Sequence, residues 1–296
     1  MAFGSHCVLI AVAAALISPA ATAAPASIPS FAPNPAVGWI ALQNEFQPPP
    51  SGAGPVQEDP AHPRVTNDEF RRSGRQPTMP VADLNNPILQ PWTREELRRH
   101  NDLALAGKAL SRGAACWPAG VPGFLLHVIH PIFFVQGPAE VLLIWQGDHD
   151  VRHIYLTDRH SRSVMPSWYG ESIGHYEGEE LVVDTIGVTT KAFVDNYFTP
   201  HTDQLHVIER FRMTQGNNIL EARIHVEDPG AFTMPWDAVS RYRRVEPGRA
   251  ENDVPFNPVS SSTVAGPLLE ASCAENPFSY FGGDSPPIPR TDKPDF

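Results

Sequence analysis

Short runs of β-branched and aromatic residues, separated by Gly, Pro, Asp or Asn, fill the chain from Cys116 to about Arg244. Runs of this length between turn residues are typical of strands. We expect nine strands, at residues 124–129, 132–136, 141–145, 151–156, 173–176, 181–185, 205–213, 219–226 and 233–243. So many short strands joined by tight turns predict an all-β fold, an antiparallel β-barrel that is closed or nearly closed.

The segment 205–226 has the clearest alternation of apolar and polar residues. Side chains two positions apart lie on the same face of a strand. Glu209 therefore shares the apolar face of its strand with Leu205, Val207, Phe211 and Met213. The next strand has a matching apolar face of Leu220, Ala222, Ile224 and Val226, and residues 215–218, Gln-Gly-Asn-Asn, predict the hairpin turn between them.

The segments on either side of these strands differ in composition. Residues 24–85 are rich in Pro, Ala and Gln, which predicts an extended arm or linker, although Gly38 to Leu42 and Phe46 could dock on the core. Thr93-Arg94-Glu95-Glu96 resembles a capping box and predicts one peripheral helix from Thr93 to Lys108, ended by Gly107 or Gly113. We therefore divide the chain into an arm at 24–85, a barrel domain with its helix at 86–246, and an extended tail at 247–296.

The N-terminus predicts export. An apolar run at residues 8–17 is too short to span a bilayer, and the small residues Ala21-Thr22-Ala23 follow it. We therefore expect a signal peptide at residues 1–23 and a periplasmic or secreted protein. Cys116 and Cys273 remain after cleavage, and in an oxidising compartment they are expected to form a disulfide that ties the tail to the barrel; two buried free thiols are the alternative.

The formal net charge of −11 argues against nucleic acid as a partner, because binding to phosphates requires clustered Lys and Arg. A small organic molecule is the expected partner. No membrane span is expected.

The sequence Gly170-x-Ser172-x-Gly174 has the spacing of a hydrolase nucleophile motif. That motif places its serine between a strand and a helix, whereas residues 175–183 predict a turn between two strands. Ser172 is therefore a weak candidate nucleophile, and the two glycines are better explained by the curvature of the sheet.

Metal binding is a second hypothesis, prompted by 12 histidines in the chain. His127 and His130 would point to opposite faces of a strand, whereas His149 and His153 share a face and would need a third ligand such as His201. Solvated or hydrogen-bonded histidines are the simpler interpretation, and we predict neither a metal nor a cofactor.

Acid–base chemistry is the third hypothesis. His149, Arg152, His201 and Glu209 offer a proton carrier and a group that holds negative charge, with Asp184 as a further acid. The alternative is that such acid and arginine pairs, Glu209 with Arg152 or with Arg210, simply neutralise one another. Aromatic residues that could line a barrel cavity include Trp168, Tyr176 and Trp236.

Several segments in register resemble one widespread family of secreted bacterial proteins, and the resemblance covers the chain from about Asn86 to Asn276. They are residues 148–156, the run 170–185 with its Gly-x-Ser-x-Gly-x-Tyr-Glu-Gly-Glu, Pro200-His201-Thr202-Asp203, Glu209-Arg210-Phe211, 227–232, Pro235-Trp236, Cys116 and Cys273-Ala274-Glu275-Asn276. The resemblance implies a lipocalin-like β-barrel and export, without an agreed reaction. This chain departs from the family at Tyr176-Glu177-Gly178-Glu179, where Trp-Glu-Gly-Asp is usual, and it carries Arg159-His160-Ser161-Arg162, which could change the substrate preference.

Taken together, the sequence predicts a cofactor-independent enzyme of the lyase or isomerase type, acting on a small aromatic or apolar compound in a barrel cavity. His149, Arg152, His201 and Glu209 would lie at the mouth as catalytic groups, and Trp168, Tyr176, Ser172 and Trp236 would bind substrate. A non-catalytic carrier of a small hydrophobic ligand, a structural protein with a filled barrel, and a hydrolase that uses Ser172 or a metal are the alternatives.

Overall fold

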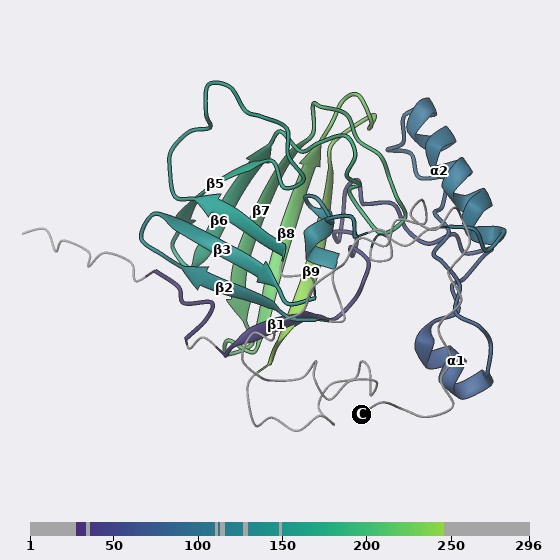
Figure 1. Cartoon of the computed structure of the whole chain (residues 1–296), viewed down its shortest axis with the longest axis horizontal. Helices are drawn as coiled ribbons and strands as arrows, with labels where there is room; N and C mark the ends of the chain where they lie inside the picture. The colour runs from purple at the N-terminus through teal and green to yellow at the C-terminus, as the bar shows by residue number, and fades with distance from the viewer. Residues whose placement is uncertain are drawn as a thin grey trace, which may run out of the picture.

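The fold is a closed barrel of nine strands, seen from the side in Figure 1. A computed structural model describes residues 28–33, 36–109, 112, 116–126, 130–147 and 150–245. The strands, in barrel order, are β1 Gly38–Ala41, β2 Ile132–Gln136, β3 Glu140–Trp145, β4 Asp150–Tyr155, β5 Glu171–Glu177, β6 Glu180–Ile186, β7 His206–Thr214, β8 Ile219–Glu227 and β9 Trp236–Val245. The predicted closed β-barrel is therefore confirmed, and eight of the expected strands lie within it.

The barrel is mixed, so the prediction that all its strands are antiparallel is wrong. Strands β4 and β5 pair in parallel, with Ile154 opposite Ser172 and Tyr155 opposite Ile173, while every other pair is antiparallel. A two-residue turn can join only antiparallel strands, whereas a parallel pair needs a connection of a dozen or more residues. The loop 156–170 is long enough to return the chain to the end of the barrel where β4 began.

The expected arm supplies one wall of the barrel. Strand β1, from the predicted linker, pairs with β2 on one side and β9 on the other and so closes the cylinder. Trp39 of β1 is fully buried and donates from its indole N–H to the carbonyl of Phe31 at 2.8 Å. Because Trp39 and its neighbours are apolar, their removal from water stabilises this part of the arm in the barrel wall.

The ninth expected strand, at residues 124–129, is absent from the described residues. A 3-10 helix, η2 (Gly123–Leu126), lies there instead, and all four of its residues are buried. Its backbone bonds are local, from the amide of Phe124 to the carbonyl of Gly120 and from Leu125 to Pro122. A short apolar run does not distinguish a buried strand from a buried helix.

Two helices lie outside the barrel on one side (Figure 1). The first, α1 (Asn67–Ser73), was not expected; the second, α2 (Pro91–Leu105), is the expected helix. Helix α2 begins two residues earlier than the capping box predicts, because Pro91 occupies its first turn, and Gly107, in the left-handed region, follows its end. Thr93 therefore lies inside the helix, where its hydroxyl donates to the carbonyl of Ala231.

The barrel interior is packed by one continuous hydrophobic core. The ring of Phe134 on β2 packs against the rings of Phe211 on β7 and Phe31 of the arm, with ring centroids 5.7 Å and 5.2 Å apart. Near the same end, Gln136 accepts from the amide of Phe31 and donates to the hydroxyl of Tyr176. Helix η2 is attached to the interior through the hydroxyl of Tyr242, which donates to the carbonyl of Leu125 at 2.6 Å.

Some predictions fall outside the described residues. They are the signal peptide, His127, His149, the tail after residue 245 and its Cys273, so the Cys116 to Cys273 disulfide stays a prediction. None of the described helices combines the length and the apolar character needed to cross a bilayer.

Candidate functional site

The structure brings Arg152, Glu209 and Ser172 together inside the barrel. Alternation along β4, β5 and β7 points these side chains inward, and all three are buried, with exposed fractions of 0%, 0% and 1%. The Nη1 of Arg152 donates to Oε1 of Glu209 at 2.9 Å, and its Nη2 donates to Oε2 of the same carboxylate. Arg152 also donates from Nε to Oγ of Ser172 at 3.2 Å and from Nη2 to Oγ1 of Thr185 at 2.9 Å.

This interior ion pair is self-contained. The guanidinium and the carboxylate bind each other in the two-point geometry that suits them best, and the hydroxyls of Ser172 and Thr185 lie 2.8 Å apart. The placement of Arg152 and Glu209 at an open barrel mouth is therefore wrong, and the alternative, that the two neutralise one another, describes what the structure shows. Ser172 lies within a strand, bound to Arg152, which is not the environment of a hydrolase nucleophile.

The other predicted site residues lie elsewhere. His201 is buried before β7, its Nδ1 lies 2.8 Å from the carbonyl of Thr202, and burial lowers its pKa, which favours the neutral imidazole. Trp168 packs against the core just before β5, and Trp236 is buried against Phe232. Tyr176 receives a hydrogen bond from Gln136. The clefts that the described residues form at α2 and at the loop 156–170 are not lined by Trp168, Tyr176, Ser172 or Trp236.

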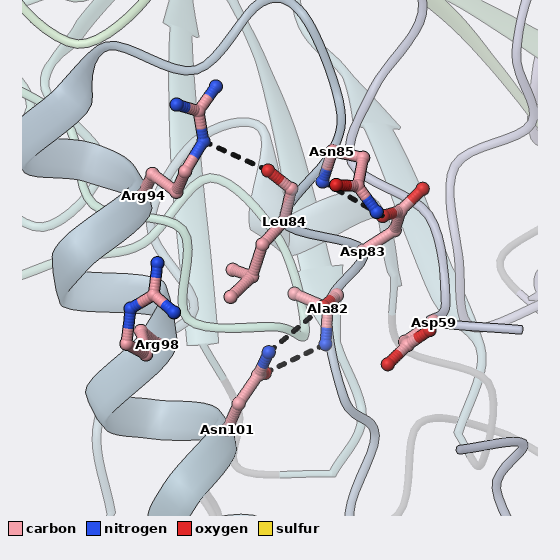
Figure 2. A pocket seen from close by; sticks show the side chains of 8 residues that line it. All are labelled: Asp59, Ala82, Asp83, Leu84, Asn85, Arg94, Arg98 and Asn101. Carbon is pink, nitrogen blue, oxygen red and sulfur yellow. Dashed lines mark hydrogen bonds between the residues drawn. The ribbon is translucent and has the colours of Figure 1, made fainter. Parts of the chain in front are cut away.

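The described part of the chain has surface clefts, and the one shown in Figure 2 lies between α2 and residues 82–85. It holds about 570 Å³ and is lined mainly by polar side chains, with Ala82 and Leu84 among them. Most of these already serve the structure: Asn101 donates to the carbonyl of Ala82 and accepts from its amide, and Arg94 donates from Nε to the carbonyl of Leu84 at 2.9 Å. We interpret this cleft as the joint that attaches α2 to the arm.

A larger cleft, of about 760 Å³, lies on the outer wall where the parallel pair meets the loop 156–170. We call it the loop cleft. It is lined by Tyr155, Thr157, Arg159, His160, Ser161, Arg162, Glu171 and Ile173. Its volume is within the range of small-molecule sites.

The two arginines of the loop cleft differ from those of the joint. Arg159 and Arg162 are exposed, and within the ranges that the structure describes neither makes an ion pair or a hydrogen bond. Tyr155 beside them is 47% exposed, and its ring stacks on His153 at 6.0 Å and 22°. The loop cleft therefore combines two available positive charges with an aromatic ring.

A row of alternating carboxylates and imidazoles begins at the loop cleft and crosses the outer wall from β5 to β9. We call it the histidine–carboxylate row. In order it consists of Glu171, His160, Asp184, His206, Glu227, His225 and Asp237.

Each imidazole of the row faces two carboxylates. Nδ1 of His160, from the loop, lies 3.0 Å from Oε1 of Glu171, and its Nε2 lies 3.1 Å from Oδ1 of Asp184. His206 lies 3.0 Å from the same oxygen of Asp184 and 3.6 Å from Glu227. The third imidazole, His225, lies 3.1 Å from Glu227 and 2.8 Å from Asp237.

The contacts of the row shift the pKa values of several of its members. Hydrogen bonding from Ser161 holds the pKa of Glu171 below its usual range, and hydrogen bonding from His225 does the same for Glu227. Partial burial lowers the pKa of His225, but its contacts with Asp237 and Glu227 outweigh burial, and the net pKa is raised. These pKa shifts favour the negative charge on Glu171 and Glu227 and the positive charge on His225.

Most of the row was missed at the level of sequence. Alternation places Asp184, His206 and His225 on outward faces, but only the register of five strands shows that they are adjacent. Among the described residues, no three His, Cys, Asp or Glu side chains have the arrangement needed to hold a metal ion.

Comparison of the chain with protein-family models, with curated proteins and with solved structures finds no match.

Proposed function

We propose that the protein binds a small organic anion that carries an aromatic or apolar group, and that the site is the loop cleft. One observation carries the proposal: Arg159 and Arg162 have no acidic partner among the described residues and lie beside the exposed ring of Tyr155. This function is closest to the non-catalytic alternative, with the ligand on the wall of the barrel instead of in its interior.

The barrel interior supports a structural role better than a catalytic one. A catalytic arginine must offer hydrogen-bond donors to a substrate. The donors of Arg152 are bonded to Glu209, Ser172 and Thr185, and its side chain has zero exposure. A packed barrel would hold β4 and β5 rigidly and so fix the floor of the loop cleft. In this proposal the protein is exported, and its barrel is lipocalin-like in outline with an interior filled by side chains.

The chemistry of the cleft limits the ligand. Guanidinium groups bind carboxylates and sulfonates through charge-assisted hydrogen bonds, and Arg also stacks on aromatic planes. Ile173 and Tyr155 supply apolar and aromatic surface. An aromatic acid matches both features, whereas a purely apolar ligand would leave the two charges unused.

Benzoate and its neutral analogue benzamide test the proposal by calorimetric titration at low ionic strength. We expect benzoate to bind more tightly than benzamide. Replacement of Arg159 and Arg162 together by Gln should weaken benzoate binding by about tenfold or more, since hydrogen bonds to charged groups contribute about 1.5–3 kcal/mol.

Arg98→Gln is the matched control. Arg98 is an exposed arginine in the joint of Figure 2 and pairs with Glu95. If benzoate binding falls in Arg98→Gln and persists in the loop-cleft variant, the site has been assigned to the wrong cleft. Equal binding of benzoate and benzamide would refute recognition of an anion.

The lyase or isomerase hypothesis is a second candidate, favoured by one observation. An ion pair at zero exposure carries a desolvation cost that a barrel of purely structural purpose need not meet. Turnover of aromatic acids by the wild type, lost in a folded Arg152→Met, Glu209→Leu double variant, would move the function to the interior.

A further inference from the structure

The three imidazoles of the histidine–carboxylate row can satisfy all their partners only when they are protonated. A neutral imidazole has one N–H donor and one lone pair, whereas an imidazolium has two donors. In the row, both nitrogens of His160, His206 and His225 face carboxylate oxygens. Loss of a proton therefore turns one lone pair of each ring toward a negative charge.

The charge of the row changes accordingly. Its four carboxylates are Glu171, Asp184, Glu227 and Asp237, and its cations are the three imidazoliums. Fully protonated histidines leave one net negative charge, and neutral histidines leave four. Exposure of the side chains ranges along the row from 17% at His160 to 55% at Asp237, so solvent screens the charges least at the end that meets the loop.

His160 connects the row to the loop that carries both arginines of the loop cleft. Within the described chain, the hydrogen bonds from residues 158–166 to the barrel wall come from His160 and from the amide of Ser161, which donates to Oε1 of Glu171 at 2.7 Å. Val164 adds an apolar contact over Gly187. The position of Arg159 and Arg162 therefore depends on the attachment of their immediate neighbours.

We propose that the histidine–carboxylate row is a proton-dependent attachment of the loop 156–170, and that protonation of the row favours anion binding in the loop cleft. The second part rests on the proposed function, whereas the first part does not. The imidazolium of His160 holds the loop on Glu171 and Asp184. Without its second proton, one of these two contacts turns repulsive, and the loop separates from the wall.

Two effects then weaken the binding of an anion. Detachment moves Arg159 and Arg162 away from Tyr155 and Ile173, and the uncompensated carboxylates of the row repel an anion. The charged groups that face His160 are Glu171 of β5 and Asp184 of β6, and Asp184 is shared with His206 of β7. Arg159 and Arg162 are the cationic groups of its own loop.

Hydrogen exchange tests the attachment without any ligand. The amide of Ser161 reports directly, since it donates to Glu171. We expect its protection, after correction for the pH dependence of intrinsic exchange, to fall about fivefold or more between pH 5 and pH 8 in the wild type. In His160→Gln the protection should be low and nearly independent of pH.

His175→Gln is the matched control, because His175 lies on the outer wall, faces a single carboxylate, Glu177, and does not touch the loop. In this variant the amide of Ser161 should show the same protection, and the same change with pH, as in the wild type. Protection of Ser161 that is constant from pH 5 to pH 8 in the wild type, or that changes equally in His160→Gln, would overturn the attachment.

Benzenesulfonate separates this inference from the proposed function, because it stays anionic throughout the range and its own titration does not contribute. We expect its affinity for the wild type to decrease about tenfold from pH 5 to pH 8, and its affinity for His160→Gln to change by less than about twofold. A pH-dependent loop with no benzenesulfonate binding at either pH would refute the proposed site while the attachment stands. Binding that ignores pH would refute the linkage while the site stands.

Discussion

Replacing one partner of the interior ion pair should destabilise the protein far more than replacing both. In Arg152→Met, the carboxylate of Glu209 remains at zero exposure without its cation, and the hydroxyls of Ser172 and Thr185 lose a donor. Breaking a buried pair in this way costs about 3–5 kcal/mol. For a domain of this size that corresponds to a decrease in Tm of about 6–20 °C.

The double variant Arg152→Met, Glu209→Leu removes both charges and keeps apolar volume in the core. Buried pairs replaced by apolar residues of similar volume leave stability unchanged or raise it by about 1–4 kcal/mol. The double variant should therefore unfold at or above the midpoint of the wild type, and well above either single variant. Glu209→Leu alone should be as unstable as Arg152→Met, because it leaves the guanidinium unpaired.

Urea unfolding followed by circular dichroism measures these differences, with thermal unfolding as a second measurement. Equal slopes in urea would show that the variants expose the same surface on unfolding. If the double variant is destabilised by the sum of the single variants, packing and not buried charge accounts for the losses. Single variants that lose less than about 1 kcal/mol would mean that water reaches the pair, and the assignment of a closed interior would be wrong.

Three further substitutions test other parts of the structure. Asn101→Ala should cost about 2–3 kcal/mol and increase hydrogen exchange at residues 81–86, because it leaves the buried amide and carbonyl of Ala82 unpaired; wild-type exchange there would contradict the joint. Gly170→Ala should cost more than about 1 kcal/mol by urea unfolding, since Gly170 has a φ of +63° and a Cβ would lie 2.3 Å from the carbonyl oxygen of Ile186; a neutral result would show that this turn can relax. His225→Gln should flatten the pH dependence of stability. The folded-state pKa of His225 is raised, so the stability it contributes is complete below its unfolded pKa of about 6.5 and is lost as the pH rises through the folded value; an unchanged profile of Tm against pH would contradict this sign.

The parts of the fold that follow from local periodicity could be predicted from the sequence. Alternation placed Glu209 on the inward face with Val207 and Phe211, and all three are buried. The tendency of acids and arginines to pair predicted Arg152 or Arg210 as a partner of Glu209, and only the structure shows that the partner is Arg152. Turn residues separated eight of the nine expected strands correctly.

The features that were missed depend on contacts between distant segments. A four-residue strand such as β1 resembles the Pro-rich arm around it, and only its pairing with β2 and β9 reveals it. The direction of β5 relative to β4 depends on the path of the loop 156–170, which has no periodicity. The histidine–carboxylate row likewise joins five strands and a loop, so no single segment of the sequence contains its pattern.

The seam between β1 and β9 has a consequence for biogenesis. Gly38 pairs with Val245, so the cylinder cannot be sealed until the last strand has been synthesised and brought back to the first. Until then β1 and the last strand to have formed present unpaired edges to neighbouring chains, and closing so long a segment is slow compared with hairpin formation. Shortening the chain before residue 236 should therefore give an aggregating, open sheet rather than a smaller barrel, and chaperones that cover strand edges should raise the yield of the full-length chain.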